Sequence, residues 1–421
     1  MTNGWTKCLS GREISLAQVT LNTGNETFER RELRTQFRRL LAKSWGDERI
    51  RQYADGHADC GAELARSLRD DMALHALTIP VDQGGLGGGC VEAAIAAEEL
   101  GAAMAPSRLL ATTMVAHLLS AARGSELAEL LPRIADGVPG TLLWSGDDAV
   151  WDVRQAPTAT VSGRAVHGTF AFVPELENSG LLLVPVRDGE RYGIAVAGPG
   201  NDAPGIQIRP MRVLDVFRPL TTVSVSLEDV EHVSWTEPGP LFSQTLAAGA
   251  IVLAAEMIGA SRACLERMAI YAQQRHQFGR PIGTFQALKH RIVDVLVSLE
   301  ASRALTYRAA GRFDDMVAGN ADAAEGITSA RMAKAAAGDT LRKASKECLQ
   351  VHGGIGFTWE NPLHFYLKRW ASSARLLGSP NQLRALVYRS VIGAGKDTAA
   401  KDAAFEQLGD FGLEHVVETH R

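Results

Sequence analysis

Two stretches in the last third of the chain combine rigid turns with polar or aromatic side chains that suit ligand binding. The first, YAQQRHQFGRPIGTFQALKH, places Arg275 at the expected end of a helix, beside a turn set by glycine and proline. A guanidinium fixed there can bind a phosphate through two hydrogen bonds, and Phe278 can pack on an aromatic ring. A solvated arginine in an ordinary turn between two helices fits the same residues.

The second stretch, QVHGGIGF, places three glycines directly after a run of helix-forming residues. Because glycine lacks a side chain, the backbone N–H groups of Gly353 and Gly354 can approach a ligand closely, and Gln350 can hydrogen-bond to a polar group there. A glycine helix cap is the alternative, although one cap needs only one glycine. No strand precedes the stretch and no helix directly follows it, so it does not match the dinucleotide-binding fingerprint.

Other common forms of active-site chemistry have no signature in the sequence. The histidines stand at irregular spacings without acidic or cysteine partners at ligand spacing, so no metal site is predicted. Neither a GxSxG nucleophile motif nor a phosphate-binding P-loop occurs. The five cysteines are scattered without a CxxC pair, which predicts reduced thiols in a cytoplasmic protein. Trp359 and Trp370 are predicted to lie in the core.

The composition is that of an ordinary globular protein and argues against several classes of partner. The chain of 421 residues, 46% of them apolar, suffices for two or three compact units. A formal net charge of −4 gives no indication of binding to nucleic acid or to an anionic membrane surface. We expect no membrane span, because no apolar run reaches the roughly 18 residues required. We also expect no signal peptide, because the first residues lack a basic-then-apolar order.

The elements that must position these residues fall into three blocks. Apolar residues recur at helical spacing in the first and last blocks, whereas short β-branched runs separated by turn-forming residues fill the middle. The pattern predicts a mostly α, α+β multidomain fold with a central antiparallel β domain and a C-terminal four-helix bundle. The predicted parts are a poorly ordered lead-in (1–25), an N-terminal helical domain (26–140), a β domain (141–240), a helical bundle (241–395) and a tail (396–421).

Together, these stretches resemble the acyl-CoA dehydrogenase family over roughly residues 28–395. IPVDQGGLGGG followed by EAAIAAEELG is similar to the family's N-terminal segment, and LTTVSVSLEDVEHV is similar to the strand that closes its β domain. RHQFGRPIGTFQALKHRIVD and QVHGGIGFTWENPLHFYLKR resemble its two C-terminal signatures, which are specific as a pair at this spacing. The predicted helical, β, helical order agrees with the family's architecture.

The resemblance implies a flavoenzyme of lipid metabolism that introduces a double bond into an acyl thioester, carried by CoA or by an acyl carrier protein. In the family, FAD lies at a subunit interface within a tetramer. A carboxylate base removes the α-proton of the thioester while the β-hydrogen leaves as hydride to the flavin. Hydrogen bonds to the thioester carbonyl stabilise the developing enolate charge. An electron-transfer flavoprotein is a candidate electron acceptor.

By the same resemblance, the predicted cofactor-binding residues are Arg275, Phe278, Gln350, Gly353 and Gly354. In the family, the two C-terminal signatures reach across the subunit interface and hold the neighbour's flavin, chiefly its adenosine diphosphate part. The β-domain loop, the strand that covers one flavin face and the base act within one subunit. The chain is therefore expected to assemble with itself in a homotetramer or with a related subunit in a heterotetramer.

The positions of the family's catalytic base carry no acid or base in this chain, so no catalytic residue is predicted. Alignment without gaps from YLKR places Leu377 at the usual glutamate and Gly378 at the glycine after it. Some family members carry the glutamate near the start of the first long C-terminal helix, where this chain has Gly249 and Ala250. Neither leucine nor glycine can accept a proton.

The β domain also departs from the family, in two segments that face the flavin. LLWSGDDAVWDVRQAP stands where the family has a TExxxGSD-type loop. Phe172, Val173 and Pro174 replace the strand that covers one flavin face, with loss of its hydroxyl. Elements that act on a neighbour's flavin thus remain, and elements that act within the subunit are changed. This division favours a non-catalytic subunit that completes the FAD site of a catalytic partner.

Three other functions remain open from the sequence. The first is a homomeric acyl-thioester dehydrogenase with a displaced base. Glu256 lies about two helical turns beyond the alternative base position, and a structural role suits it better. The second is a flavin-dependent oxidase or monooxygenase on the same fold, which needs no carboxylate at Leu377. The third is a purely structural protein without FAD.

Overall fold

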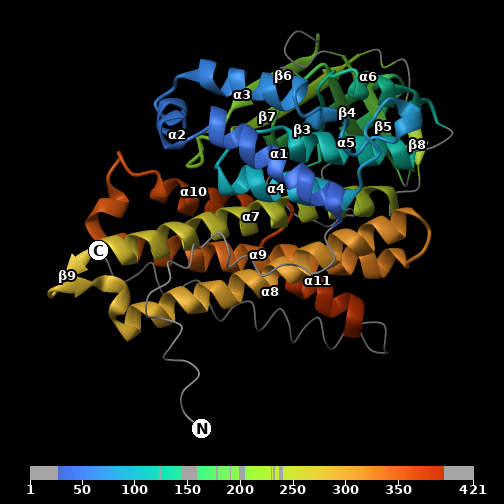
Figure 1. The fold of residues 1–421 in the computed structure, drawn as a ribbon. Helices are drawn as coiled ribbons and strands as arrows, with labels where there is room; N and C mark the ends of the chain where they lie inside the picture. Colours follow the sequence, from blue (N-terminus) through green and yellow to red (C-terminus); the bar gives the residue numbers. More distant parts are fainter. Residues whose placement is uncertain are drawn as a thin grey trace, which may run out of the picture.

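The chain folds into a layer of short helices with a β-sheet, packed on a layer of long helices (Figure 1). The helical, β, helical order along the chain agrees with the sequence prediction. The computed structural model describes residues 27–392 apart from 123–124, 145–158, 177–178, 190, 199–203, 229, 231–232 and 237–239.

The N-terminal part is built from short helices, as its apolar periodicity predicts. In the first of them, Phe37 and Leu41 are buried one turn apart, and the Thr27 hydroxyl accepts a hydrogen bond from the backbone N–H of Arg30. The helices are α1 (Phe28–Ser44), α2 (Asp47–Ala54), α3 (Ala58–Asp70), α4 (Cys90–Ala102), α5 (Leu109–Ala121) and α6 (Leu131–Ala135), with 3₁₀ turns η3 (Leu74–Ala76), η4 (Val81–Gln83) and η5 (Glu126–Leu130).

The central sheet is mixed, with the strand order β6-β7-β3-β2-β4-β5-β8 and β1 paired to β4. Most neighbours are antiparallel, as predicted, but β4 pairs in parallel with both β1 and β2. Alternating apolar residues identify a strand without giving its direction, so the sequence could not show these pairs. The strands are β1 (Gly140–Leu142), β2 (Ala159–Ser162), β3 (Ala165–Pro174), β4 (Leu181–Asp188), β5 (Arg191–Ala197), β6 (Ile206–Pro210), β7 (Leu220–Leu227) and β8 (Val233–Thr236).

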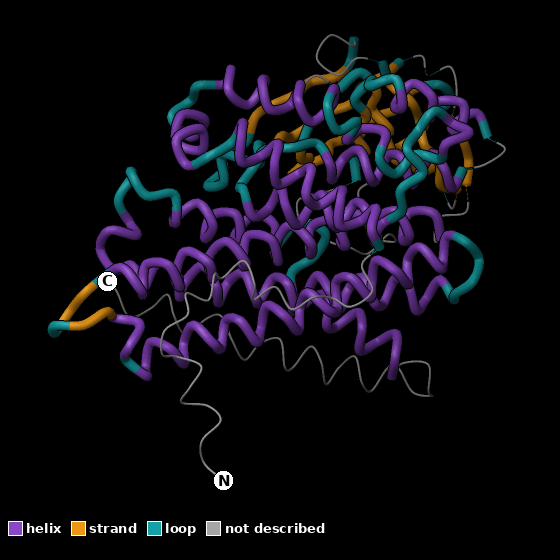
Figure 2. The backbone as a smooth tube through the Cα atoms, viewed as in Figure 1, coloured by secondary structure: helices purple, strands orange, loops and turns teal. Residues whose placement is uncertain are grey.

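The C-terminal part is a bundle of long helices that run side by side (Figures 1 and 2). Its longest helices form because the segments between the turns contain few residues other than good helix formers. The elements are α7 (Pro240–Gln274), the small hairpin β9 (His276–Gln277) and β10 (Arg280–Pro281), η6 (Ile282–Thr284), α8 (Gln286–Val317), α9 (Ala323–His352), η7 (Gly353–Phe357), α10 (Leu363–Ser373) and α11 (Pro380–Ile392).

Helix α7 lies at the centre of the protein, in contact with α4, α5, α8, α9 and α10. Residues Leu241–Gln274 are long and apolar enough to span a membrane, although the sequence contains no uninterrupted apolar run of that length. However, 78% of the most apolar window of this helix is buried inside the protein. A helix that is apolar on every side and covered by other helices is typical of a protein core.

Two glycines bring the backbones of α4 and α7 into contact. A Cβ atom on Gly259 would lie 1.9 Å from the carbonyl oxygen of Glu98, and one on Gly101 would lie 2.1 Å from that of Glu256. Any side chain at either position would therefore force the two helices apart. The close approach also buries Glu98 and Glu99 beside the guanidinium groups of Arg34 and Arg262.

The N-terminus of α4 is capped from the bundle. Asp314 on α8 accepts hydrogen bonds from the backbone N–H groups of Cys90 (2.6 Å) and Val91 (3.2 Å). Glycine precedes the helix, so the chain supplies no side-chain cap of its own at that position. Asp314 therefore joins the first helical part of the protein to the last.

We expect Asp314→Ala to lower the free energy of unfolding by about 1–2 kcal/mol, because two buried N–H groups at the start of α4 lose their acceptor. Chemical denaturation measures the change. Asp315→Ala is the matched control, because Asp315 is exposed on the same helix. Equal stability losses in the two variants would contradict a capping role.

Candidate functional site

The two C-terminal signatures lie at the same end of the bundle (Figure 1). The first forms the end of α7, the β9–β10 hairpin and the start of α8, and the second forms the end of α9 and η7. The rings of Tyr271 and His352 stack with centroids 4.2 Å apart and so hold these two segments together. As predicted, one helix ends just before Arg275 and the next begins just after Phe285.

Arg275 and Phe278 extend from this end of the bundle into solvent. The backbone of Arg275 is fixed by hydrogen bonds to Tyr271 and Ile282, whereas no hydrogen bond or ion pair joins its guanidinium to another described residue. Phe278 is 91% exposed and has a φ of +54°, a conformation that residues with bulky side chains rarely adopt. Its ring meets Phe285 edge-on, with centroids 6.1 Å apart. Both side chains are thus positioned and left open.

The glycines after α9 present bare backbone. Gly353 has a φ of +63°, which favours glycine, and a Cβ atom added to Gly353 or Gly354 would meet nothing within 4 Å. Gln350 is exposed one turn before them. The N–H of Gly353 itself caps α9 by donating to the carbonyls of Leu349 and Gln350. A guanidinium, an aromatic ring, an amide and uncovered glycine backbone at one end of the bundle fit the phosphates and rings of FAD. No other described part of this chain covers these groups, so they remain accessible to a ligand.

Three further exposed apolar residues surround the glycines, and sequence reasoning did not identify them as part of this surface. Ile355 is 52% exposed, Phe357 67% and Trp359 48%. The prediction that Trp359 lies in the core was wrong: its ring stacks on His364, and its indole N–H donates to Asp55 at 2.8 Å. Trp370 is partly buried against the core. The single available signal was the concentration of aromatic residues directly after the glycines.

The two positions at which the resemblance places the family's base meet inside the protein. Gly249 lies on α7 and Leu377 on the turn between α10 and α11, 128 residues further along the chain. A Cβ atom on Gly249 would lie 2.9 Å from Leu377 Cδ1 and 2.8 Å from Met114 Sδ. Leu377 and Met114 are 0% and 2% exposed. Apolar side chains therefore fill the space between the two predicted base positions.

Glu256, the candidate for a displaced base, is held in a buried network of charges. Its carboxylate pairs with Arg218 and with Arg369, and it accepts a hydrogen bond from the Ser373 hydroxyl at 2.9 Å. Burial alone would raise the pKa of Glu256, but the two guanidinium groups and Ser373 bring it below its ordinary value. A carboxylate stabilised in its charged form by three donors is a weak base, and this one has a structural role.

The changed strand of the β domain is irregular at the predicted position. The pairing of β3 with β7 shifts register between Phe170 and Val173, and Phe172 has a φ of +55°. Val173 is 1% exposed, and its carbonyl accepts a hydrogen bond from Thr221. A bulge of this kind redirects side chains locally. Most of the loop LLWSGDDAVWDVRQAP lies outside the described residues, because 145–158 are not among them.

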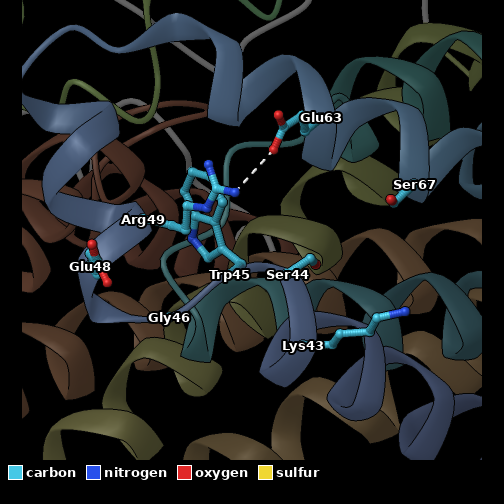
Figure 3. Close-up of a pocket in the computed structure, with 8 residues that line it drawn as sticks. All are labelled: Lys43, Ser44, Trp45, Gly46, Glu48, Arg49, Glu63 and Ser67. Atoms are coloured by element: carbon cyan, nitrogen blue, oxygen red, sulfur yellow. Dashed lines mark ion pairs between the residues drawn. The ribbon is translucent and has the colours of Figure 1, made fainter.

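A separate groove of about 420 Å³ lies between the end of α1, the start of α2 and α3 (Figure 3). Arg49 and Glu63 form an ion pair of 3.2 Å at this groove. The groove carries both signs of charge, and none of the predicted site residues lines it. Among the described residues, no group of three or more His, Cys, Asp or Glu side chains could hold a metal ion.

Comparison with known proteins places this arrangement in a family. Residues 27–138 match the N-terminal domain of acyl-CoA dehydrogenases, and residues 240–392 match their C-terminal domain. The Mycobacterium tuberculosis protein named acyl-CoA dehydrogenase IpdE2 is 34% identical over 357 residues, which cover 84% of this chain and 95% of that protein. The chain belongs to the acyl-CoA dehydrogenase family.

Solved structures of acyl-CoA dehydrogenases share the fold. A structure of a variant of the Tcur3481-Tcur3483 steroid ACAD has a TM-score of 0.72 and 26% identity, covering 89% of this chain and 99% of that chain. The ChsE4-ChsE5 complex from Mycobacterium tuberculosis has a TM-score of 0.72, and at 21% identity it supports the fold alone. It covers 88% of this chain and 99% of that chain.

We expect Glu256→Gln to destabilise the protein by about 3 kcal/mol at neutral pH, because two buried guanidinium groups lose their shared counter-charge. The pKa of Glu256 is lower in the folded state than its ordinary 4.5. Its stabilising contribution is therefore full above pH 4.5 and is lost as pH falls through the folded pKa. Denaturation of parent and variant at several pH values should show their difference shrinking in acid.

The half-exposed Glu266 provides the control for this measurement. It forms an i,i+4 pair with Arg262 at 3.3 Å on the same helix. Glu266→Gln should change stability by no more than about 0.5 kcal/mol. A pH-independent difference between parent and Glu256→Gln would contradict the buried ion-pair role.

We expect Leu377→Glu to destabilise the protein by about 3 kcal/mol or more, because a carboxylate would be buried against Met114 and Gly249 without a hydrogen-bonding partner in place. Leu377→Met conserves volume and polarity and should cost less than about 1.5 kcal/mol. Thermal and chemical denaturation compare the two. Leu377→Glu should also fail to confer dehydrogenation of an acyl-CoA. A stable, active glutamate variant would show that the space is available to substrate.

Proposed function

We propose that this chain is a non-catalytic subunit of a heteromeric acyl-CoA dehydrogenase and completes the FAD site of a catalytic partner. The observation that carries the proposal is the filled base position, where Leu377 and Met114 pack against Gly249. Both places at which the family keeps its carboxylate converge there, and neither contains an ionisable group. Desaturation of the acyl thioester is accordingly assigned to the partner.

The exposed end of the bundle supports the same division of roles. Arg275 and Phe278 on one segment, with Gln350 and the bare backbone of Gly353 and Gly354 on the other, are the residues that would hold FAD bound in the partner. The guanidinium would pair with phosphate oxygens, and the ring would pack on a ring of the cofactor. When bound, FAD supplies a hydride acceptor for the reaction on the partner.

Glu256 offers no support for an independent enzyme. A general base must be free to take up a proton near neutral pH, and the depressed pKa of this carboxylate works against that. It also pairs with Arg218 and Arg369, so protonation would remove the carboxylate charge that these two buried guanidinium groups share and leave only Glu175 near Arg218 and Asp215 beside Arg369. A homomeric enzyme with a displaced base is therefore the weaker candidate.

The relatives support a heteromer and give a substrate class. One solved relative carries two protein names, Tcur3481-Tcur3483, and is described as a steroid ACAD. We accordingly assign to the assembly a CoA thioester with a steroid-type acyl group. The acceptor of its electrons would be an electron-transfer flavoprotein, as the family resemblance implies.

The decisive experiment is co-expression with a candidate partner, an acyl-CoA dehydrogenase that has glutamate at the base position. The two chains should purify as one complex with one FAD per two chains, and an acyl-CoA should bleach the flavin. Purification of this chain alone as a homotetramer with one FAD per chain would overturn the proposal. Oxygen uptake driven by NAD(P)H and added reduced flavin would instead support a monooxygenase.

Arg275→Ala and Phe278→Ala should each weaken FAD binding by the complex about tenfold or more, because a charged hydrogen bond or a ring contact is lost. The two side chains are exposed in the isolated chain, so its folding stability should not change. Cofactor content after dialysis and FAD titration measure the effect. Arg133→Ala, at an exposed arginine in α6, is the control. Unchanged FAD content in both variants would show that these residues do not touch the cofactor.

A further inference from the structure

The turn that carries Leu377 is held in an unfavourable backbone conformation. Leu377 has a φ of +56°, in the left-handed region that favours glycine, and Gly378 follows it with a φ of +87°. A leucine adopts this conformation only when its surroundings compensate for the close contact between its side chain and backbone. The side chain is also 0% exposed, so it is fixed both in backbone and in position.

Lys334 on α9 supplies a contact on each side of Leu377. Its Nζ donates to the carbonyl oxygen of Gly378 at 2.7 Å and to that of Ala374 at 3.2 Å. These two carbonyls come directly after Leu377 and three residues before it. A single ammonium group therefore joins the end of α10 to the residue after the leucine, and the left-handed turn is closed between them.

The position of Lys334 is unusual for a lysine. It is 1% exposed, and no described carboxylate lies within ion-pair distance of it. Burial lowers the pKa of Lys334 to about 7, with a further contribution from Arg218. A long, flexible cation without a counter-charge is costly to bury, and a methionine would fill the same volume without that cost. The hydrogen bonds that the amine donates to the two carbonyls explain why a lysine stands at this position.

A second contact places the same face of α9 against the turn. Gly338, one helical turn after Lys334, faces Pro380, where a Cβ atom would lie 3.0 Å from Pro380 Cγ. The same Cβ atom would lie 3.6 Å from the side chain of Ala374. The turn is thus supported along its length by α9, with packing at one point and hydrogen bonds at another.

We propose that Lys334 is a positioning residue that holds Leu377 over Gly249 and so keeps an acyl chain out of this subunit. The amine bonds to the backbone of the turn, while the leucine side chain of that turn lies against Gly249 on α7. The inference rests on the proposed function, because it explains how a subunit without a base keeps its own acyl site closed. Lys334, through its two hydrogen bonds to the turn, is the residue that keeps this site closed.

Lys334→Met, which keeps volume and removes both donors, is the test, with Lys334→Gln as the matched variant that keeps an N–H donor. In the purified complex, hydrogen exchange of the 374–378 amides should be about tenfold faster or more in Lys334→Met, and nearer to the parent rate in Lys334→Gln. Exchange in α7 and α9 should be unchanged. Equal exchange of the turn in all three proteins, or a uniform rise throughout the bundle, would overturn the positioning role.

Octanoyl-CoA serves as the probe of closure. Calorimetric titration should show additional binding to Lys334→Met beyond that of the parent complex, and none to Lys334→Gln. Faster exchange without additional binding would overturn the claim that the turn excludes an acyl chain. The FAD content of the parent complex decides the proposed function separately, since no variant is needed to measure it.

Discussion

Contact between the backbones of α4 and α7 is the constraint on which the other helices depend. Gly101 and Gly259 leave no side chain between the two helices, and each meets a carbonyl of the opposite one. This contact places α7 in the centre, where α5, α8, α9 and α10 also pack on it. Because 78% of the most apolar window of α7 is buried, the helix depends on the elements that cover it, and the fold is built around it.

Helix α7 thereby connects a closed apolar contact in the interior with an exposed surface at the end of the bundle. Near its start, Gly249 meets Leu377 and Met114 in a closed apolar contact. At its end, Arg275 and Phe278 leave the bundle and face solvent. The rigidity of α7 means that the exposed end is positioned by the same packing that closes the interior. A partner that binds the exposed end is presented with a preorganised surface, which lowers the entropy cost of binding.

The sequence predicted what depends on neighbouring residues and missed what depends on tertiary contacts. Glycine and proline near Arg275, and glycine after Gln350, gave the helix ends correctly, because caps and turns are local. The contact between Gly249 and Leu377 could be suspected only from a family resemblance, since the two stand 128 residues apart. The exposure of Trp359 was missed because aromatic residues are usually buried and its partners Asp55 and His364 are not evident from spacing.

The pattern of charge in the interior explains how this chain can be stable without substrate. A catalytic carboxylate must be desolvated to work, and its burial is costly until a ligand arrives. In this chain leucine occupies that position and gains apolar burial instead, while the nearby Glu256 is fully compensated by Arg218, Arg369 and Ser373. The remaining cost is the left-handed turn at Leu377, which the hydrogen bonds of Lys334 offset. Under the proposed function, leucine thus replaces a buried carboxylate with apolar packing, and recognition of the cofactor is left to the exposed end of the bundle.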